Sequence, residues 1–119
     1  MKIHIFYRHF DISGTDGRRR PQWFDFEKCF KNLLNTIEGT QVNLNVIFDG
    51  HVEKNWINKY KDKFTTHEIK AGGDQSSFFQ TWEIVKNSNV GDDDLIYFLE
   101  NDYLHLEGWV DKVVELFEK

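Results

Sequence analysis

The sequence predicts a three-layer α/β domain with a mostly parallel sheet of four strands, in the spatial order 3-2-1-4. Short apolar runs alternate four times with segments whose apolar residues recur at helical spacing. Strands separated by helices imply right-handed crossovers and therefore a parallel sheet. The last run, Leu95–Leu99, has five consecutive apolar residues, which is typical of a strand buried on both faces. We expect residues 1–119 to form a single domain, because a chain of this length supports one core and not two.

The first half of the chain supplies two predicted strands and one helix. Residues 2–7 are mostly apolar and form the first strand, and the alternating residues 42–48 form the second, which ends at Asp49. Between them Asp25 is an N-cap candidate and Gly39 a stop signal. The apolar positions of that helix are Phe26, Cys29, Phe30, Leu33, Leu34 and Ile37. Cys29 lies on this apolar face, so we expect a core residue, with a reactive thiol as the alternative.

The second half continues the same alternation. A second helix is followed by a short strand at residues 66–70, and Gly72 and Gly73 then break the chain before a third helix. After the fourth strand comes a last helix. The apolar residues that mark these three helices are Trp56, Ile57, Tyr60 and Phe64, then Phe78, Trp82 and Val85, then Trp109, Val110, Val113, Val114 and Phe117.

Composition excludes several classes of protein. The net charge of −5 argues against a protein that coats nucleic acid, so no nucleic-acid partner is expected. A single cysteine allows neither an internal disulfide nor a cysteine-based zinc site. No run is long and apolar enough for a signal peptide or a transmembrane segment. A cytoplasmic protein is therefore the expectation.

Polar residues follow the predicted strands where they end. Arg8, Asp49, Glu100 and Asp102 all occupy such positions, and the ligands of parallel sheets bind at this edge. The carboxylates of Glu100 and Asp102 could hold a divalent cation against a phosphate. The alternative is that one carboxylate caps the following turn and the other is solvated. Asp92, Asp93 and Asp94 precede the same strand, and we expect them to form a solvated turn.

The segment from Gly72 to Ser77 could also contact a ligand. Glycines allow close approach of the backbone, and a helix N-terminus offers N–H groups to anions. The alternative is a glycine turn with Asp74 or Ser76 as an ordinary N-cap. Neither the P-loop nor the dinucleotide-binding spacing is present. The run Arg18–Arg20 could contact phosphates or an anionic acceptor, but we expect a solvated loop. His105 could complete a metal site, but we expect a surface histidine.

Taken in order, these segments resemble the N-terminal, nucleotide-binding half of GT-A-fold glycosyltransferases, particularly the large inverting family two. The resemblance covers nearly the whole chain. Its most specific part is Ile96–His105, which is similar to the strand that ends in a D-x-D or E-D-D motif in that family. The resemblance implies that Asp102 and Glu100 hold Mg²⁺ or Mn²⁺. It also implies a nucleotide site that comprises Arg8, Asp49, Gly73, Gln75 and Asn101.

The implied ligands are a nucleoside-diphosphate sugar and a carbohydrate acceptor. Two departures from the family pattern limit what is carried over. Asn101 takes the middle position of the motif, which removes one charge. The family also needs about twice this length, in line with one more domain, and the second half carries the acceptor site and the catalytic base. We therefore expect a fragment or a domain that needs a partner, assign no catalytic residue, and expect no glycosyl transfer by this chain alone.

Two other classes of protein stay open. A receiver-like signalling module has a similar size, but it needs an acidic pair after the first strand, where this chain has Arg8 and His9, and a fifth βα unit. A non-catalytic nucleotide-binding or interaction domain could keep the fold without the activity. Finally, the apolar arc of the last helix, residues 109–117, is wide enough to leave part exposed. This predicts a weak homo-oligomer through the C-terminal helix.

Overall fold

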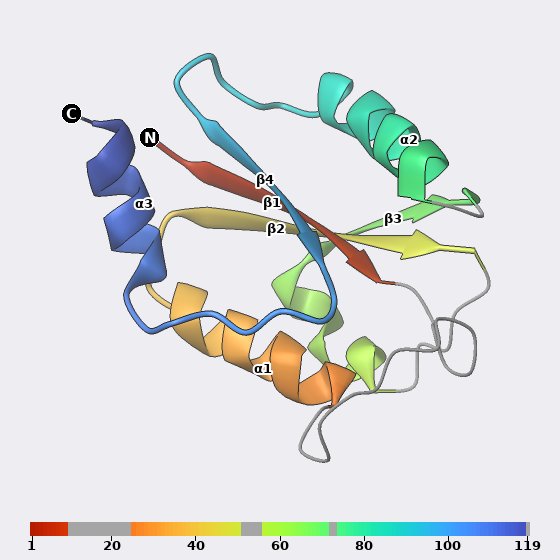
Figure 1. The fold of residues 1–119 in the computed structure, drawn as a ribbon, viewed down its shortest axis with the longest axis horizontal. Helices are drawn as coiled ribbons and strands as arrows, with labels where there is room; N and C mark the ends of the chain where they lie inside the picture. Colours follow the sequence, from red (N-terminus) through yellow and green to blue (C-terminus); the bar gives the residue numbers. More distant parts are fainter. Residues whose placement is uncertain (10–24, 51–55, 72–73, 119) are drawn as a thin grey trace.

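The computed structural model has one parallel sheet with the strand order β3-β2-β1-β4, as the sequence predicts (Figure 1). The structure describes residues 1–9, 25–50, 56–71 and 74–118. The strands are β1 (Ile3–His9), β2 (Val42–Asp49), β3 (Thr65–Ile69) and β4 (Leu95–Glu100), and the pairs β1–β2, β1–β4 and β2–β3 are all parallel. The first strand of the chain therefore lies in the middle of the sheet.

Helices cover the two faces of the sheet unequally. The first face carries α1 (Phe26–Ile37), the 3-10 helix η1 (Ile57–Lys63) and α3 (Trp109–Phe117), which enclose the main core around Ile5, Tyr7 and Phe30. The second face carries α2 (Asp74–Lys86) alone, packed on Phe6 and Ile47. Right-handed crossovers explain this division, since the chain steps outward from β1 to β3 and then returns across the sheet to β4.

Helix α1 begins as the sequence predicts. The side chain of Asp25 accepts a hydrogen bond from the backbone N–H of Glu27 at 2.9 Å, which is an N-cap. Cys29 is buried in the core, so that prediction is confirmed. Glu27 then binds η1, because its carboxylate accepts from Tyr60 at 2.9 Å and lies 2.7 Å from the Lys59 ammonium.

The predicted second helix is present, but it is short and not an α-helix. The segment folds as the 3-10 helix η1, in which Ile57 is the only buried residue and Trp56 provides no side-chain cap. Apolar residues at 57 and 60 supply about one turn of contact with the core, and the rest of the segment is rich in lysine. A short connector of this kind is a usual place for a 3-10 helix.

Helix α2 buries one of its three predicted apolar residues, Val85, but neither Phe78 nor Trp82. Ser77, Thr81 and Val85 face the sheet, whereas Phe78 and Trp82 are exposed. The buried side of α2 packs over β1, β2 and β3, and the rings of Phe78 and Trp82 contact Phe98 on β4. Small side chains at 77 and 81 let the helix lie close to the sheet, and the large aromatic residues are turned toward the edge at β4.

Strand β4 is likewise not buried on both faces. It lies at the edge of the sheet, and Ile96 and Phe98 are each 36% exposed on the face that α2 covers only in part. Its other face, with Leu95, Tyr97 and Leu99, packs on the main core. The uninterrupted apolar run therefore marks an edge strand, and its second apolar face has no complete cover within the described part of the chain.

Asp94 is bonded, not solvated as expected for the acidic turn. Its carboxylate binds the ring of the buried His4 at 2.8 Å and accepts from the backbone N–H groups of Lys2 and Gly91 at 3.1 and 3.0 Å. The His4 bond, followed by the two backbone bonds, lowers the pKa of Asp94 to about 2. Asp94 thus fastens the start of β4 to the start of β1.

Among the described residues, no helix is long and apolar enough to cross a membrane.

Candidate functional site

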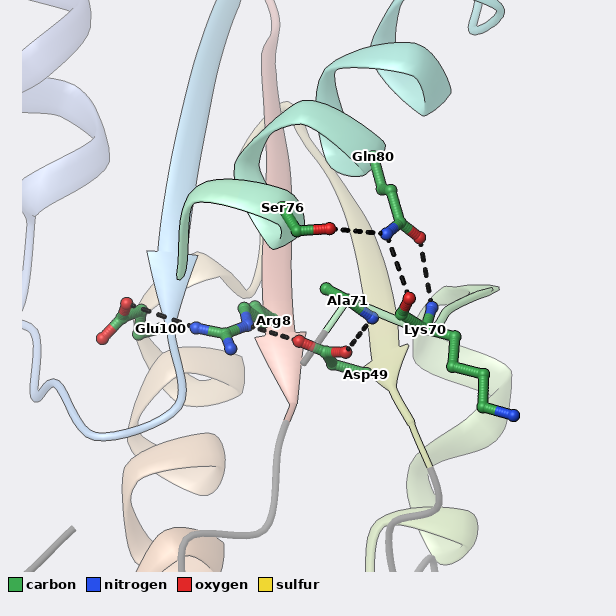
Figure 2. Close-up of polar contacts among 7 residues, drawn as sticks. All are labelled: Arg8, Asp49, Lys70, Ala71, Ser76, Gln80 and Glu100. Atoms are coloured by element: carbon green, nitrogen blue, oxygen red, sulfur yellow. Dashed lines mark hydrogen bonds and ion pairs between the residues drawn. The ribbon is translucent and has the colours of Figure 1, made fainter. Parts of the chain in front are cut away.

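Arg8 and Asp49 form the centre of the candidate site, at the carboxyl edge of the sheet (Figure 2). The Nε atom of Arg8 donates to Oδ2 of Asp49 at 3.0 Å, and Nη1 of Arg8 lies 3.7 Å from Oε1 of Glu100. The side chains of Arg8 and Asp49 are only 14% and 6% exposed. One cation therefore joins the ends of three strands, β2, β1 and β4.

Strand register places these three side chains on one face. Arg8 is paired with Glu100 across β1 and β4, so the two side chains point the same way. On β2, Asp49 follows Ile47, the register partner of Arg8, by two residues and therefore shares its face. This is the face that carries α2.

The chain after β3 closes the site from one side. Oδ1 of Asp49 accepts from the backbone N–H of Ala71 at 3.1 Å. The side-chain amide of Gln80 binds the backbone of Lys70 twice, at 3.1 Å each, and donates to Ser76 at 3.0 Å. Figure 2 shows this chain of contacts from Asp49 to the first turns of α2. It fixes the start of α2 next to the Arg8–Asp49 pair.

A groove opens beside Arg8 between α2 and β4. It has a volume of about 450 Å³, and Arg8 and Glu100 line its charged end. The walls are mostly apolar, and include Phe6, Ser77, Phe78, Thr81, Phe98 and Tyr103, of which Ser77, Thr81 and Tyr103 carry hydroxyl groups. A groove with aromatic walls and a charged end suits a ligand that has a flat ring and an ionic group.

Asn101 and Asp102 lie in the turn after β4. Asn101 is fully buried, with its amide nitrogen 3.4 Å from Nδ1 of His9. Burial raises the pKa of the Tyr7 phenol well above its usual value, and the charges of Cys29 and Asp102 raise it further. Asp102 therefore acts electrostatically on Tyr7, a residue of the main core.

The two predicted metal ligands have different surroundings. Glu100 faces Arg8 at 3.7 Å, whereas Asp102 is half-buried and influences Tyr7. Within the described ranges there is no group of three or more His, Cys, Asp or Glu side chains that could hold a metal ion. An ion held by two carboxylates would take its other ligands from water and phosphate oxygens, and this role of Glu100 and Asp102 stays a prediction.

Of the other predicted site residues, Gln75 is exposed on the first turn of α2. Gly73 and Arg18–Arg20 lie outside the described residues.

His105 is half-buried and not a surface residue. Its Nε2 atom lies 2.9 Å from the Tyr97 hydroxyl, and burial lowers the pKa of His105. Sequence analysis missed the role of Gln80, because a side chain that binds backbone ten residues away has no local pattern.

Comparisons with protein-family models, with curated proteins and with solved structures found no match to this chain. The observations that bear on function are therefore the four-stranded parallel α/β fold and the polar cluster at its carboxyl edge.

Proposed function

We propose that this domain binds a nucleoside-diphosphate sugar at the carboxyl edge of its sheet, as the donor-binding half of a glycosyltransferase. The observation that carries the proposal is the nearly buried Arg8–Asp49 pair at the ends of the two central strands. In open α/β sheets, ligands bind outside the carboxyl ends of the strands. The reaction implied is transfer of the sugar to a carbohydrate acceptor, and no catalytic residue is assigned.

Asp49 and Arg8 suit complementary roles toward a nucleotide. A carboxylate accepts hydrogen bonds from the N–H groups of a base, and a guanidinium donates to ribose or phosphate oxygens. Both side chains already have fixed partners, in Ala71 and in each other. A site that is ordered before the ligand arrives loses less side-chain entropy on binding.

Charge explains why a divalent cation belongs to this proposal. In the described part of the chain, the ends of β1, β2 and β4 carry one cation, Arg8, against three carboxylates, Asp49, Glu100 and Asp102. A diphosphate would meet net negative charge at this edge. Mg²⁺ or Mn²⁺ near Asp102, with Glu100 as the second candidate ligand, would neutralise the diphosphate.

The strand order favours this proposal over a receiver-like module. In receiver domains the first strand lies between the second and the third. Here β1 lies between β2 and β4, and β3 is at the far edge. The end of β1 carries Arg8 and His9 instead of an acidic pair.

Thermal denaturation with a panel of nucleoside diphosphates, each with and without Mn²⁺, tests the proposal. A ligand that binds only the folded chain raises the melting temperature in a concentration-dependent way. We expect such a rise for at least one nucleotide, and a smaller rise for Asp49→Ala even when metal is omitted. Asp93→Ala, on the exposed turn before β4, is the matched control. If no nucleotide stabilises the parent chain, the proposal is wrong.

A further inference from the structure

We propose that the edge strand β4 and the adjoining aromatic surface of α2 form an interface with a second copy of this chain, related by a two-fold axis. This surface, here called the aromatic face, consists of Phe78, Phe79, Trp82, Ile96, Phe98 and Tyr103. It is separate from the apolar arc of α3. Phe78, Phe98 and Tyr103 also line the groove beside Arg8, but the argument for the interface does not depend on nucleotide binding and its test uses no nucleotide.

Four rings of the aromatic face, those of Phe78, Phe79, Trp82 and Phe98, form one continuous cluster. The ring centroids of Phe78 and Phe98 are 5.2 Å apart, those of Phe78 and Phe79 are 6.1 Å apart, and those of Trp82 and Phe98 are 6.4 Å apart. Phe78 and Phe79 are nevertheless 51% and 58% exposed. A contiguous exposed apolar patch of this kind marks an interaction site more often than scattered apolar residues do.

Exposed apolar residues are concentrated in the second half of the chain. Apart from Met1, the exposed large apolar side chains of the described residues all belong to α2, to β4 or to the chain after β4. The opposite edge strand, β3, exposes Thr65, Thr66 and Glu68. Of the two edges of the sheet, the edge at β4 is therefore the one suited to burial.

The backbone of β4 adds to the same surface. In the described sheet β4 is paired only with β1, so its second edge can pair with another strand. Pairing of β4 with β4 of a second copy would be antiparallel about a two-fold axis, and it would bring the two aromatic faces together. Head-to-tail pairing of β4 with β3 would leave the aromatic face against the polar edge.

The available area approaches what a dimer needs. An aromatic side chain offers about 150–250 Å², so the five rings of the aromatic face, each roughly half exposed, present on the order of 500 Å² per copy. A standard interface buries about 800 Å² per partner. The edge of β4 and the side chain of Ile96 would supply much of the difference.

Charge gives the proposed interface a distinctive salt dependence. Asp92 and Asp93 are exposed before β4, and Asp102 follows it. Antiparallel pairing places the acidic start of one strand near the acidic end of the other. Salt screens this repulsion and leaves the apolar contact in place. Association is therefore expected to strengthen with salt, whereas a charge-complementary contact would weaken.

Sedimentation of the full chain over a wide concentration range, at low and high salt, tests the interface. We expect a reversible dimer that strengthens with salt, and a monomer for Ile96→Lys and for Phe78→Lys. The matched control is Leu116→Lys, which changes an apolar residue that is 66% exposed on α3 and should not affect the dimer. Thermal unfolding of each variant checks that it is folded. A monomeric parent, a dimer weakened by salt, or loss of the dimer only in Leu116→Lys would overturn the proposal.

Cross-linking provides a second measurement that does not depend on affinity. The single native cysteine, Cys29, is buried, so an introduced cysteine is the accessible one. With a short bismaleimide, Ile96→Cys should give a covalent dimer, and Thr66→Cys on β3 should stay monomeric. Equal yields from the two variants, or a dimer from Thr66→Cys alone, would contradict a two-fold interface at β4.

Discussion

The guanidinium of Arg8 and the carboxylate of Asp49 lie 3.0 Å apart and join the carboxyl ends of the two central strands, β1 and β2. The second contact of Arg8, to Glu100, is longer at 3.7 Å, and the Glu100 side chain is more exposed. A ligand could therefore displace Glu100 from Arg8 more easily than Asp49. This difference assigns Asp49 to the fixed part of the site and Glu100 to the part that can rearrange.

We predict that Asp49→Asn lowers the free energy of unfolding by about 1–3 kcal/mol, because it removes the charge that accepts from a nearly buried guanidinium. Urea denaturation near neutral pH measures the change. Asp93→Asn, at an exposed position before β4, should change stability by less than about 0.5 kcal/mol. Equal effects at the two positions would mean that the Arg8–Asp49 pair adds no stability.

We predict that Asp102→Asn leaves the fold intact and abolishes the part of nucleotide stabilisation that depends on Mn²⁺. The reason is the loss of one carboxylate from a site that would hold its cation with two. Melting temperatures measured with nucleotide alone, and with nucleotide and Mn²⁺, separate the two contributions. If parent and variant respond equally to Mn²⁺, Asp102 is not a metal ligand.

We predict that Asp94 stabilises the fold only above strongly acidic pH. Its pKa in the folded chain is about 2, below the value of about 3.9 for an unperturbed aspartate. The stabilisation is therefore fully present above about pH 4 and is lost as the pH falls toward 2. Urea denaturation of parent and Asp94→Ala over this range should show a difference that shrinks with acid. A difference independent of pH would contradict the assignment.

We predict that stability also falls with acid at His105, but in a window at higher pH than that of Asp94. Burial lowers the pKa of His105 in the folded chain, so the unfolded chain binds the proton more readily. Stability is then fully present above the unfolded pKa of about 6.5 and falls as the pH drops below it. His105→Gln should flatten the pH dependence of unfolding on the acid side of neutrality. His67, whose pKa is also lowered by burial, offers a comparison through His67→Gln.

The topology was predictable because apolar pattern and crossover handedness determine it. The four strands, their order and the N-cap at Asp25 all agree with the sequence-based prediction. The choice of buried face on α2 was not predictable, because Phe78 and Trp82 repeat at the same helical spacing as Thr81 and Val85. A helix that must lie close to a sheet buries its small side chains, and that requirement comes from tertiary packing.

The candidate site was predictable in part for the same reason. Arg8, Asp49 and Glu100 meet because parallel strands end at one edge, and the sequence contains that information. The separate surroundings of Asn101 and Asp102 depend on how the chain turns after β4. The role of Asp94 depends on His4, ninety residues away, and no local pattern joins the two.

The central position of β1 has a consequence for how the protein folds. Ile3 on β1 is paired with Leu95 on β4, which is ninety-two residues later in the chain. One edge of β1, the most buried strand, therefore stays unpaired until β4 has been synthesised. Pairing these strands closes a long loop, and the chain loses conformational entropy before native contacts compensate for it. Strand pairing of this kind is therefore slow. During synthesis on the ribosome, an apolar strand with an open edge would therefore persist until β4 emerged. This interval is when the chain would depend most on a chaperone, and a delay just before β4 would lengthen it.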